Sequence, residues 1–429
     1  MMLKESASPS LGYDPYFGLF VALFLLIFGV TNKTLTMSTA ETSRMAAIES
    51  MVLYQTQSID HSYFLELTND FILREGKHYS DKPPIFAFFG ALVYGILYKI
   101  FNLAYTLRGG WAHYWIKWFL TGLPLLALGT IFYLQFRSEL QSARKAFLFT
   151  CLGTFGTLLM PYATVLNNHS TSASFYGIAL YFLWKKQAYY FWAGFFFAFA
   201  CTLDFSGFIV SLPLGIWLLF QRISLRKWLY FWIGVSLPLG IHAILNIPIT
   251  GDFKPGAMHL EYFSWMAPEA RKYLTGGLAW NHFGDYCWYL FHMLVGHRGF
   301  FLHCPLVLFG AWECFKTVKN PEISKSERGI AFSFLVSMFL LILYYSTCSR
   351  RFGDYCYSIR WFLLFLPPFL FYLPQFYQKK SNLFIFCSLI WIMMVTLPAF
   401  HNPFVNKTYH SFSFIYNSVQ ILKDLQFLH

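Results

Sequence analysis

The sequence predicts an all-α, polytopic membrane protein with one integral membrane domain over residues 1–429. Three observations support this fold class. Of the 429 residues, 57% are hydrophobic and only 12% are charged. Apolar runs recur from about residue 16 to about residue 399, and the basic residues lie between these runs in small groups. A soluble globular domain does not combine these properties, whereas a chain that crosses a bilayer many times does.

Eleven apolar runs are long enough to cross a bilayer. They lie at about 16–33, 113–134, 145–163, 171–184, 188–203, 206–220, 228–246, 298–316, 329–347, 361–377 and 383–399. The first run is followed by TLTMSTAETSRM, which lacks a small-residue cleavage site. We therefore expect a retained first span and not a signal peptide.

The formal net charge of +12 comes from scattered Lys and Arg residues and not from a basic domain, which argues against a nucleic-acid partner. With the N-terminus inside, all five short basic loops fall on the cytoplasmic side, as the positive-inside rule requires. These loops carry Arg137, Arg144 and Lys145; Lys185 and Lys186; Arg222, Arg226 and Lys227; Lys316, Lys319, Lys325 and Arg328; and Lys379 and Lys380.

The apolar segment PPIFAFFGALVYGILYKIFNL at 84–104 decides the topology. If it crossed the bilayer, all five basic loops would move outside, against the positive-inside rule. We therefore expect a juxtamembrane or re-entrant helix that begins and ends on the outer side. The outer regions are then a large first loop at 34–112, a second at 247–297 and a C-terminal tail at 400–429.

The first outer loop holds two groups of ionisable residues. Glu41 follows the first span, and Arg44 lies one helical turn later. A partly desolvated carboxylate near a cation can act as a base, although an acid that starts a short helix has the same pattern. In SDKPP, Asp81 and the prolines fit a helix start. Lys82 is unfavourable at the positive end of a helix unless an anion binds there, which indicates a phosphate site.

Ionisable residues also lie at the outer ends of later spans. Arg360 ends the loop SRRFGDYCYSIR, and Arg298, His169 and Asp204 lie in VGHRGFF, VLNNHS and CTLDF. Arginine suits phosphate because its planar group donates two hydrogen bonds. Each residue alone also fits an interfacial anchor or a satisfied interior polar group. Their convergence on one outer face favours a site for a lipid-linked phosphate.

No metal or redox motif stands out in the chain. The eight cysteines form no CxxC pair, and the histidines are too dispersed for a zinc site. We expect no obligatory cofactor, and ligand spacing does not indicate a divalent metal. Cys348 and Cys356 flank one short loop, where they either pair or remain thiols. The sequon at Asn168 matters only in a eukaryotic secretory membrane.

The residues ETSRMA at 41–46 and DKPP at 81–84 resemble the D-E-x-R-Y-A and E/D-K-P-P motifs of one family. This family is the polytopic GT-C glycosyltransferases that use polyprenyl-phosphate sugars, in the branch of the protein O-mannosyltransferases and the lipid A aminoarabinose transferase. Later stretches such as LLMPYATVLNNHSTSASF and DYCYSIRWFLLFLPPF are similar to bacterial members, so the likeness runs to about residue 375. The departures are Glu41 for Asp, Thr42 and Met45 for Glu and Tyr, and Ser358-Ile359 for Gly-Pro.

The resemblance implies an inverting glycosyltransferase of a bacterial inner membrane with its active site on the periplasmic side. The donor is a polyprenyl-phosphate sugar, and the acceptor is a lipid, a glycan or a protein. The implied roles are catalysis for Glu41 and Asp81, donor phosphate binding for Lys82, Arg360 and Arg298, and sugar or acceptor contacts for His169, Asp204 and Arg44.

A transporter or flippase of an anionic lipid or lipid-linked sugar is the alternative, because it also needs cations inside a polytopic fold. The sequence shows no inverted repeat. Its charges are predicted to gather on one side of the membrane and not at the midplane, where alternating access places a substrate site. Both features favour the transferase.

Overall fold

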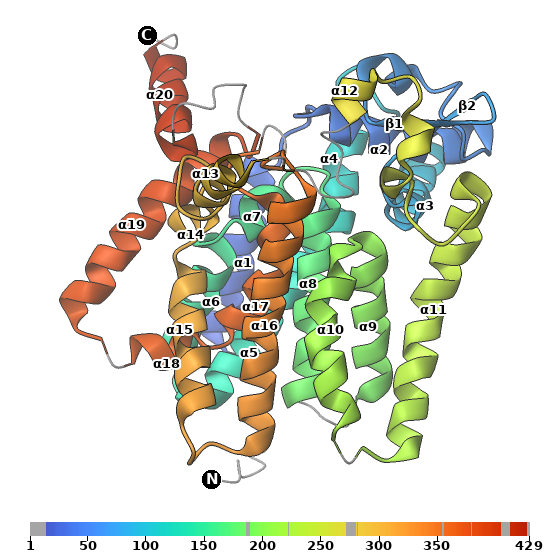
Figure 1. Ribbon diagram of the computed structural model, residues 1–429. Coiled ribbons are helices and arrows are strands. Elements are labelled where there is room, and N and C mark those ends of the chain that lie inside the picture. The colour runs from blue at the N-terminus through green and yellow to red at the C-terminus, as the bar shows by residue number, and fades with distance from the viewer. Residues whose placement is uncertain are drawn as a thin grey trace.

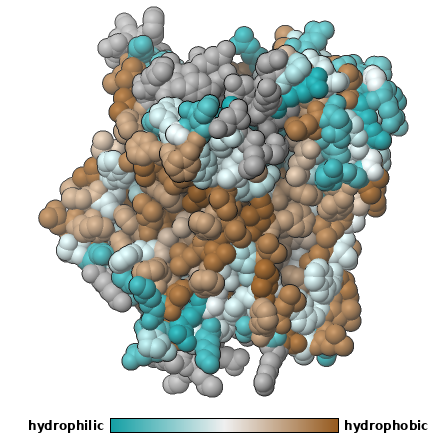
Figure 2. All heavy atoms as spheres, viewed as in Figure 1, coloured by the Kyte–Doolittle hydropathy of each residue, from teal (hydrophilic) through white to brown (hydrophobic). Residues whose placement is uncertain are grey.

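The computed structural model describes residues 14–185, 189–221, 223–271, 280, 282–353, 356–378, 380–404 and 412–426. A bundle of long helices fills the lower part of Figure 1, and a layer of shorter elements lies across its upper end. Figure 2 shows a broad brown belt of apolar residues across the middle of the face in view, with hydrophilic residues gathered towards both ends. This distribution is that of a protein whose middle lies in lipid.

Every predicted span coincides with helical structure. The longer helices of the bundle are α1 (Pro15–Thr31), α5 (Leu123–Leu140), α6 (Ala143–Phe155), α8 (Asn168–Leu180), α9 (Tyr190–Leu203), α10 (Ser206–Leu219), α11 (Leu225–Thr250), α15 (Leu306–Lys319), α16 (Lys325–Cys348) and α19 (Asn382–His401). Two π-helical stretches, η3 (Trp118–Gly122) and η4 (Tyr181–Lys185), adjoin α5 and α8. The all-α membrane fold is therefore confirmed.

Not every predicted span is one unbroken helix. Within the described residues, five helical segments are long and apolar enough to cross a membrane: Pro84–Phe101, Gly110–Leu140, Leu225–Thr250, Lys325–Cys348 and Leu383–His401. Other spans divide into shorter pieces, which include α7 (Leu159–Ala163), α14 (Phe300–His303), η7 (Arg360–Phe365), α17 (Leu366–Leu370) and α18 (Leu373–Tyr377). Prolines such as Pro305 and Pro374 account for breaks, because proline lacks the amide that continues a helix. The count of eleven spans stays a prediction.

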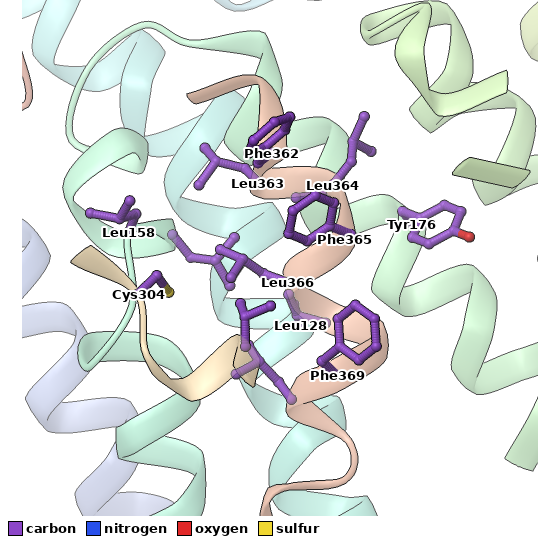
Figure 3. Packing of buried hydrophobic residues seen from close by; sticks show 14 of the residues in the cluster. Leu128, Leu158, Tyr176, Cys304, Phe362, Leu363, Leu364, Phe365, Leu366 and Phe369 are labelled. Carbon is purple, nitrogen blue, oxygen red and sulfur yellow. The ribbon is translucent and has the colours of Figure 1, made fainter. Parts of the chain in front are cut away.

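The segment η7–α17 lies at the centre of the bundle. Phe362, Leu363, Phe365 and Phe369 have no exposed surface. Figure 3 shows these side chains packed among residues of other helices, including Leu128. Burial on all sides explains why this segment reads as a continuous apolar run in the sequence. It also holds Arg360, the first residue of η7, in a rigid frame.

The upper layer comes largely from the predicted first outer loop. Its elements are α2 (Thr39–Glu49), η1 (Ser50–Tyr54), η2 (Tyr63–Leu67), β1 (Phe71–Arg74), β2 (Lys77–Ser80), α3 (Pro84–Phe101) and α4 (Gly110–Lys117). Further elements at this end are η5 (Gly256–Met258), η6 (Leu260–Phe263), α12 (Pro268–Arg271), α13 (Phe283–Leu294) and α20 (Ser413–Gln426). The basic α10–α11 and α15–α16 connections lie at the opposite end (Figure 1).

The hairpin β1–β2 is an addition to the all-α prediction. The strands are antiparallel, and Phe71 pairs with Ser80. Glu75 and Gly76 both have positive φ, of 52° and 76°, at the turn. Two residues with positive φ form the type I′ turn that closes a two-residue hairpin. The turn residues are Glu75-Gly76 and not the Asn-Gly that usually marks such a turn, so the sequence pattern did not reveal the hairpin.

Helix α3 is the segment whose orientation decides the predicted topology. Its length and composition would allow a membrane span. In Figure 1 it lies at the end of the bundle that holds α2 and the hairpin, beside the upper end of α11. It ends at Asn102, whose φ of 52° closes the last turn. This position agrees with the expected outer-side helix, which stays a prediction.

No disulfide joins Cys348 to Cys356 in the structure, and Cys356 Sγ donates a hydrogen bond of 2.5 Å to the Gly353 carbonyl.

Helices α9 and α11 approach each other at two glycines. A Cβ added at Gly194 would lie 2.1 Å from the Phe231 carbonyl oxygen, and one added at Gly234 would lie 2.1 Å from the Phe191 carbonyl oxygen. Small residues let helix backbones pack closely in a membrane, where the hydrophobic effect does not drive helix association.

We expect Gly234→Val to destabilise the protein by roughly 1–3 kcal/mol, because the side chain forces α9 and α11 apart. Thermal unfolding in detergent measures the effect. The matched control is Gly240→Val on the same helix, where an added Cβ meets no atom within 4 Å. Equal destabilisation by both substitutions would contradict this account of the α9–α11 contact.

The predicted topology places Lys99 outside and Lys319 inside, and both side chains are exposed. We expect Lys99→Cys, in a chain whose native cysteines are replaced, to react with a membrane-impermeant thiol reagent in intact cells. Lys319→Cys is expected to react only after permeabilisation. Labelling of position 99 that requires permeabilisation would overturn the topology.

Candidate active site

Glu41 is a fully buried carboxylate in the first turn of α2. Its Oε1 accepts a hydrogen bond of 2.6 Å from the Leu166 amide, and its Oε2 accepts one of 2.5 Å from the Met37 amide. His113 Nε2 lies 3.5 Å from Oε1. Burial alone raises the pKa of Glu41, but His113, Lys117 and the Leu166 amide outweigh it and lower the pKa to about 2. Glu41 is therefore an anion that joins α2 to two other segments.

Arg44 lies one turn further along α2 and is 3% exposed. One terminal nitrogen donates to the Ala40 carbonyl at 2.7 Å, and the other donates to Asn168 Oδ1. Its guanidinium lies over the Phe86 ring, 5.8 Å from the centroid. Arg44 Nε is buried and has no hydrogen-bond partner among the described residues.

A second arginine, Arg360, lies close enough to act on Arg44. Burial and then the charge of Arg360 lower the pKa of Arg44 to about 10, although Asp81, Asp70 and Glu41 oppose the shift. Arg360 is 7% exposed and lies over the Phe404 ring at 5.8 Å. Two guanidinium groups brought together in a buried site repel each other, and an anion between them relieves the repulsion.

The hairpin brings two carboxylates to one lysine. Asp70 directly precedes β1 and Asp81 directly follows β2, so the pairing of Phe71 with Ser80 sets the two acids side by side. Lys82 Nζ lies 3.2 Å from Asp70 Oδ2 and 3.0 Å from Asp81 Oδ2. The hairpin is tied to α2, because the Ser43 hydroxyl donates to the Asp70 carbonyl at 2.5 Å.

The two carboxylates have different environments. Burial raises the pKa of Asp81, Lys82 lowers it and Asp70 raises it further, and the net shift is upward. For Asp70, burial is outweighed by Lys82, Arg360 and Arg44, so its pKa is lowered. Asp81 Oδ1 is buried and has no hydrogen-bond partner among the described residues. Asp81 is thus the carboxylate with an open oxygen and the greater affinity for a proton.

His169, in the first turn of α8, is hydrogen-bonded to Asp204, which directly follows α9. The Asn167 side chain caps α8 by accepting from the His169 amide. Asn168, the residue before His169, is 4% exposed. Its side chain donates to the Leu203 carbonyl at 2.7 Å and accepts from Arg44. Asn168 is therefore held inside the folded protein and is not a surface residue.

Seven of the eight predicted site residues lie in one connected group: Glu41, Arg44, Asp81, Lys82, His169, Asp204 and Arg360. Arg298 has a scaffold position, because it donates to the Cys356 carbonyl and the Ser413 hydroxyl and accepts at its own carbonyl from Ser358. It therefore supports the loop that leads into Arg360.

Asp70, His113 and Lys117 were not found from the sequence. Asp70 lies in the unremarkable stretch LTNDFI, and only the hairpin register places it beside Asp81. His113 and Lys117 lie one turn apart at the start of the predicted span 113–134, and nothing in the sequence pattern marked them as site residues. Among the described residues, no group of three or more His, Cys, Asp or Glu side chains is placed to hold a metal ion.

No family model and no curated protein matches the chain. Two solved structures are similar to it. One is ArnT from Cupriavidus metallidurans bound to undecaprenyl phosphate, with a TM-score of 0.53, 13% identity, and coverage of 89% of this chain and 63% of that chain. The other is the Archaeoglobus fulgidus oligosaccharyltransferase in its apo form, with a TM-score of 0.49, 12% identity, and coverage of 97% and 56%.

The chain spans less than two thirds of the length of either structure. At these identities the likeness to ArnT concerns the fold alone. The order of helices, the helical layer at one end of the bundle and this likeness together show that the chain has the fold of the GT-C membrane glycosyltransferases, as the resemblance of its motifs predicted.

Proposed function

We propose that this protein is an inverting glycosyltransferase that transfers a sugar from a polyprenyl-phosphate donor to an acceptor hydroxyl at the outer face of a bacterial inner membrane. The observation that carries the proposal is the buried pair Arg44 and Arg360, which adjoins the group of Asp70, Asp81 and Lys82 at one end of the membrane bundle. An anion site and a base are the two elements that this reaction requires.

The arginine pair is the better candidate for the donor phosphate. Lys82 was predicted to bind the phosphate, but its ammonium already lies between two carboxylates. The Nε of Arg44 is a buried donor without an acceptor among the described residues. The ArnT structure, which shares the fold, holds undecaprenyl phosphate, a lipid phosphate of the class proposed here.

Asp81 is the proposed base. The acceptor oxygen attacks the anomeric carbon, the bond from that carbon to the phosphate oxygen breaks, and Asp81 takes the hydroxyl proton. Its open Oδ1 and raised pKa suit this role. Glu41 was predicted to be the catalytic carboxylate, but both of its oxygens accept backbone hydrogen bonds and its pKa is low. We therefore propose that Glu41 positions α2 and Arg44.

The acceptor is a lipid, a glycan or a protein, and a labelled-donor assay distinguishes these classes. Purified protein is incubated with radiolabelled polyprenyl-phosphate sugars and a membrane extract, and the products are separated into lipid, glycan and protein fractions. Label in one fraction supports the transferase. Movement of intact donor across a vesicle membrane, with no transfer in any fraction, would support a flippase and overturn the proposal.

We expect Asp81→Asn to lower turnover by roughly 10²–10⁴-fold, the usual contribution of a general base. The fold is expected to remain intact, because the raised pKa of Asp81 means that its ionised form does not stabilise the protein. Transfer assays combined with thermal unfolding measure both effects. Turnover at the wild-type rate would remove Asp81 from the mechanism.

Glu41→Gln is expected to act mainly on stability. The folded-state pKa of about 2 lies below the ordinary value of 4.5, so the stabilisation from Glu41 is fully present above about pH 4.5 and is lost as the pH falls towards 2. At neutral pH the loss is roughly 3 kcal/mol. Denaturation in detergent at pH 7 and at pH 3 checks this. A stable Glu41→Gln protein without transfer activity would instead return the base to Glu41.

A further inference from the structure

The pair His169–Asp204 has the geometry of an oriented imidazole. His169 Nδ1 is hydrogen-bonded to Asp204 Oδ2. The other carboxylate oxygen, Oδ1, accepts from the Ser206 hydroxyl at 2.7 Å and from the Ser206 amide at 3.1 Å. An ionised carboxylate only accepts hydrogen bonds, so Nδ1 carries a proton and the orientation of the ring is fixed.

The other ring nitrogen of His169 is open. Nε2 has no hydrogen-bond partner in the part of the chain that the structure describes. The His169 side chain is 12% exposed, whereas Asp204 behind it is 5% exposed. The ring therefore presents Nε2 towards accessible space and turns its bound nitrogen to the protein interior.

The charges around His169 are those of the arginine pair. Burial lowers the pKa of His169, Asp204 opposes this shift, and Arg360 and Arg44 add to the lowering. Arg44 also donates a hydrogen bond to the side chain of Asn168, the residue that precedes His169. On α16, the hydroxyl groups of Tyr344 and Tyr345 are the further titratable groups near Asp204. His169 thus lies beside the arginine pair.

This placement matches the stereochemistry of an inverting displacement. The acceptor and the leaving phosphate lie on opposite faces of the anomeric carbon. If the arginines hold the phosphate, then a group beside the arginines faces the leaving group. A bound phosphate also neutralises the two arginines that disfavour a second proton on His169, so donor binding favours the imidazolium.

We propose that His169, oriented by Asp204, takes up a proton when the donor phosphate binds and donates it to the departing phosphate oxygen. This role rests on the proposed function and adds a second proton-transfer group to it. Asp204 acts through His169 and is a positioning residue.

The step is balanced in protons and electrons. The bond between the anomeric carbon and the phosphate oxygen breaks with its electron pair on that oxygen. The diester carries one negative charge and the leaving monoester carries up to two, so the negative charge grows in the transition state. The Nε2 proton of His169 stabilises this growing negative charge. An interaction that is stronger in the transition state than in the ground state accelerates the reaction. Asp81 receives the acceptor proton on the other face.

Binding of a polyprenyl phosphate, measured between pH 6 and pH 8.5, tests the proton uptake. We expect affinity for the wild type to fall with rising pH more steeply than affinity for His169→Gln, by up to tenfold over the range. The titration of the phosphate itself is the same in both measurements, so the difference reports His169. His61→Gln, a change to an exposed histidine outside the site, is the matched control and is expected to keep the wild-type slope.

Transfer assays complete the test. His169→Gln is expected to lower turnover by roughly 10²-fold with little change in donor KM at pH 8, where the wild-type imidazole is mostly neutral before binding. Asp204→Asn keeps the shape of the pair and is expected to shift the alkaline limb of the pH–turnover profile to lower pH.

Identical pH slopes and profiles for the wild type and His169→Gln would overturn the inference, provided that the wild type transfers sugar. Absence of transfer from any polyprenyl-phosphate sugar by the wild type would instead overturn the proposed function.

Discussion

The buried carboxylate of Glu41 is the interaction on which the site depends. It accepts hydrogen bonds from the Met37 and Leu166 amides and lies beside His113, in the layer across the upper end of the bundle. In a low dielectric a carboxylate without partners is expensive, so α2 is strongly held in the one position that supplies these donors. Lys117, near Glu41, in turn donates to the Lys33 carbonyl at 2.5 Å and so links the end of α1 to the same group.

The orientation of α2 determines the rest of the upper layer. Arg44 points to Asn168 because Glu41 sets the rotation of the helix one turn earlier. Ser43, on another side of α2, holds the ends of the hairpin through the Asp70 carbonyl and the Ser80 hydroxyl. One buried anion therefore aligns a cation with the bundle and two carboxylates with the hairpin. The proposed base Asp81 differs from Glu41 in its hydrogen bonds: both oxygens of Glu41 accept backbone hydrogen bonds, whereas Asp81 Oδ1 accepts none from the described residues.

Charge in the site is arranged by region. Asp70, Asp81 and Lys82 form ion pairs at the hairpin, and the His169–Asp204 pair lies beside Arg44, which is hydrogen-bonded to Asn168. Arg44 and Arg360 lower the pKa of Asp70 and also that of His169. We therefore propose that the substrate anion binds at the two arginines. The fully buried η7–α17 segment holds Arg360 at a fixed depth, so the protein and not the substrate bears the cost of ordering the site.

Composition and the positions of apolar runs were enough to determine the membrane class, because burial in lipid requires long apolar helices whatever the tertiary contacts. The motifs ETSRMA and DKPP located most of the site and indicated the fold. The chemical roles proposed for the individual residues depend on the tertiary structure. Asp70 joins Asp81 through a strand register that the sequence did not reveal. Glu41 and Asp81 look alike as isolated acids, and their roles separate because a base needs an open lone pair, which depends on neighbours distant in the chain.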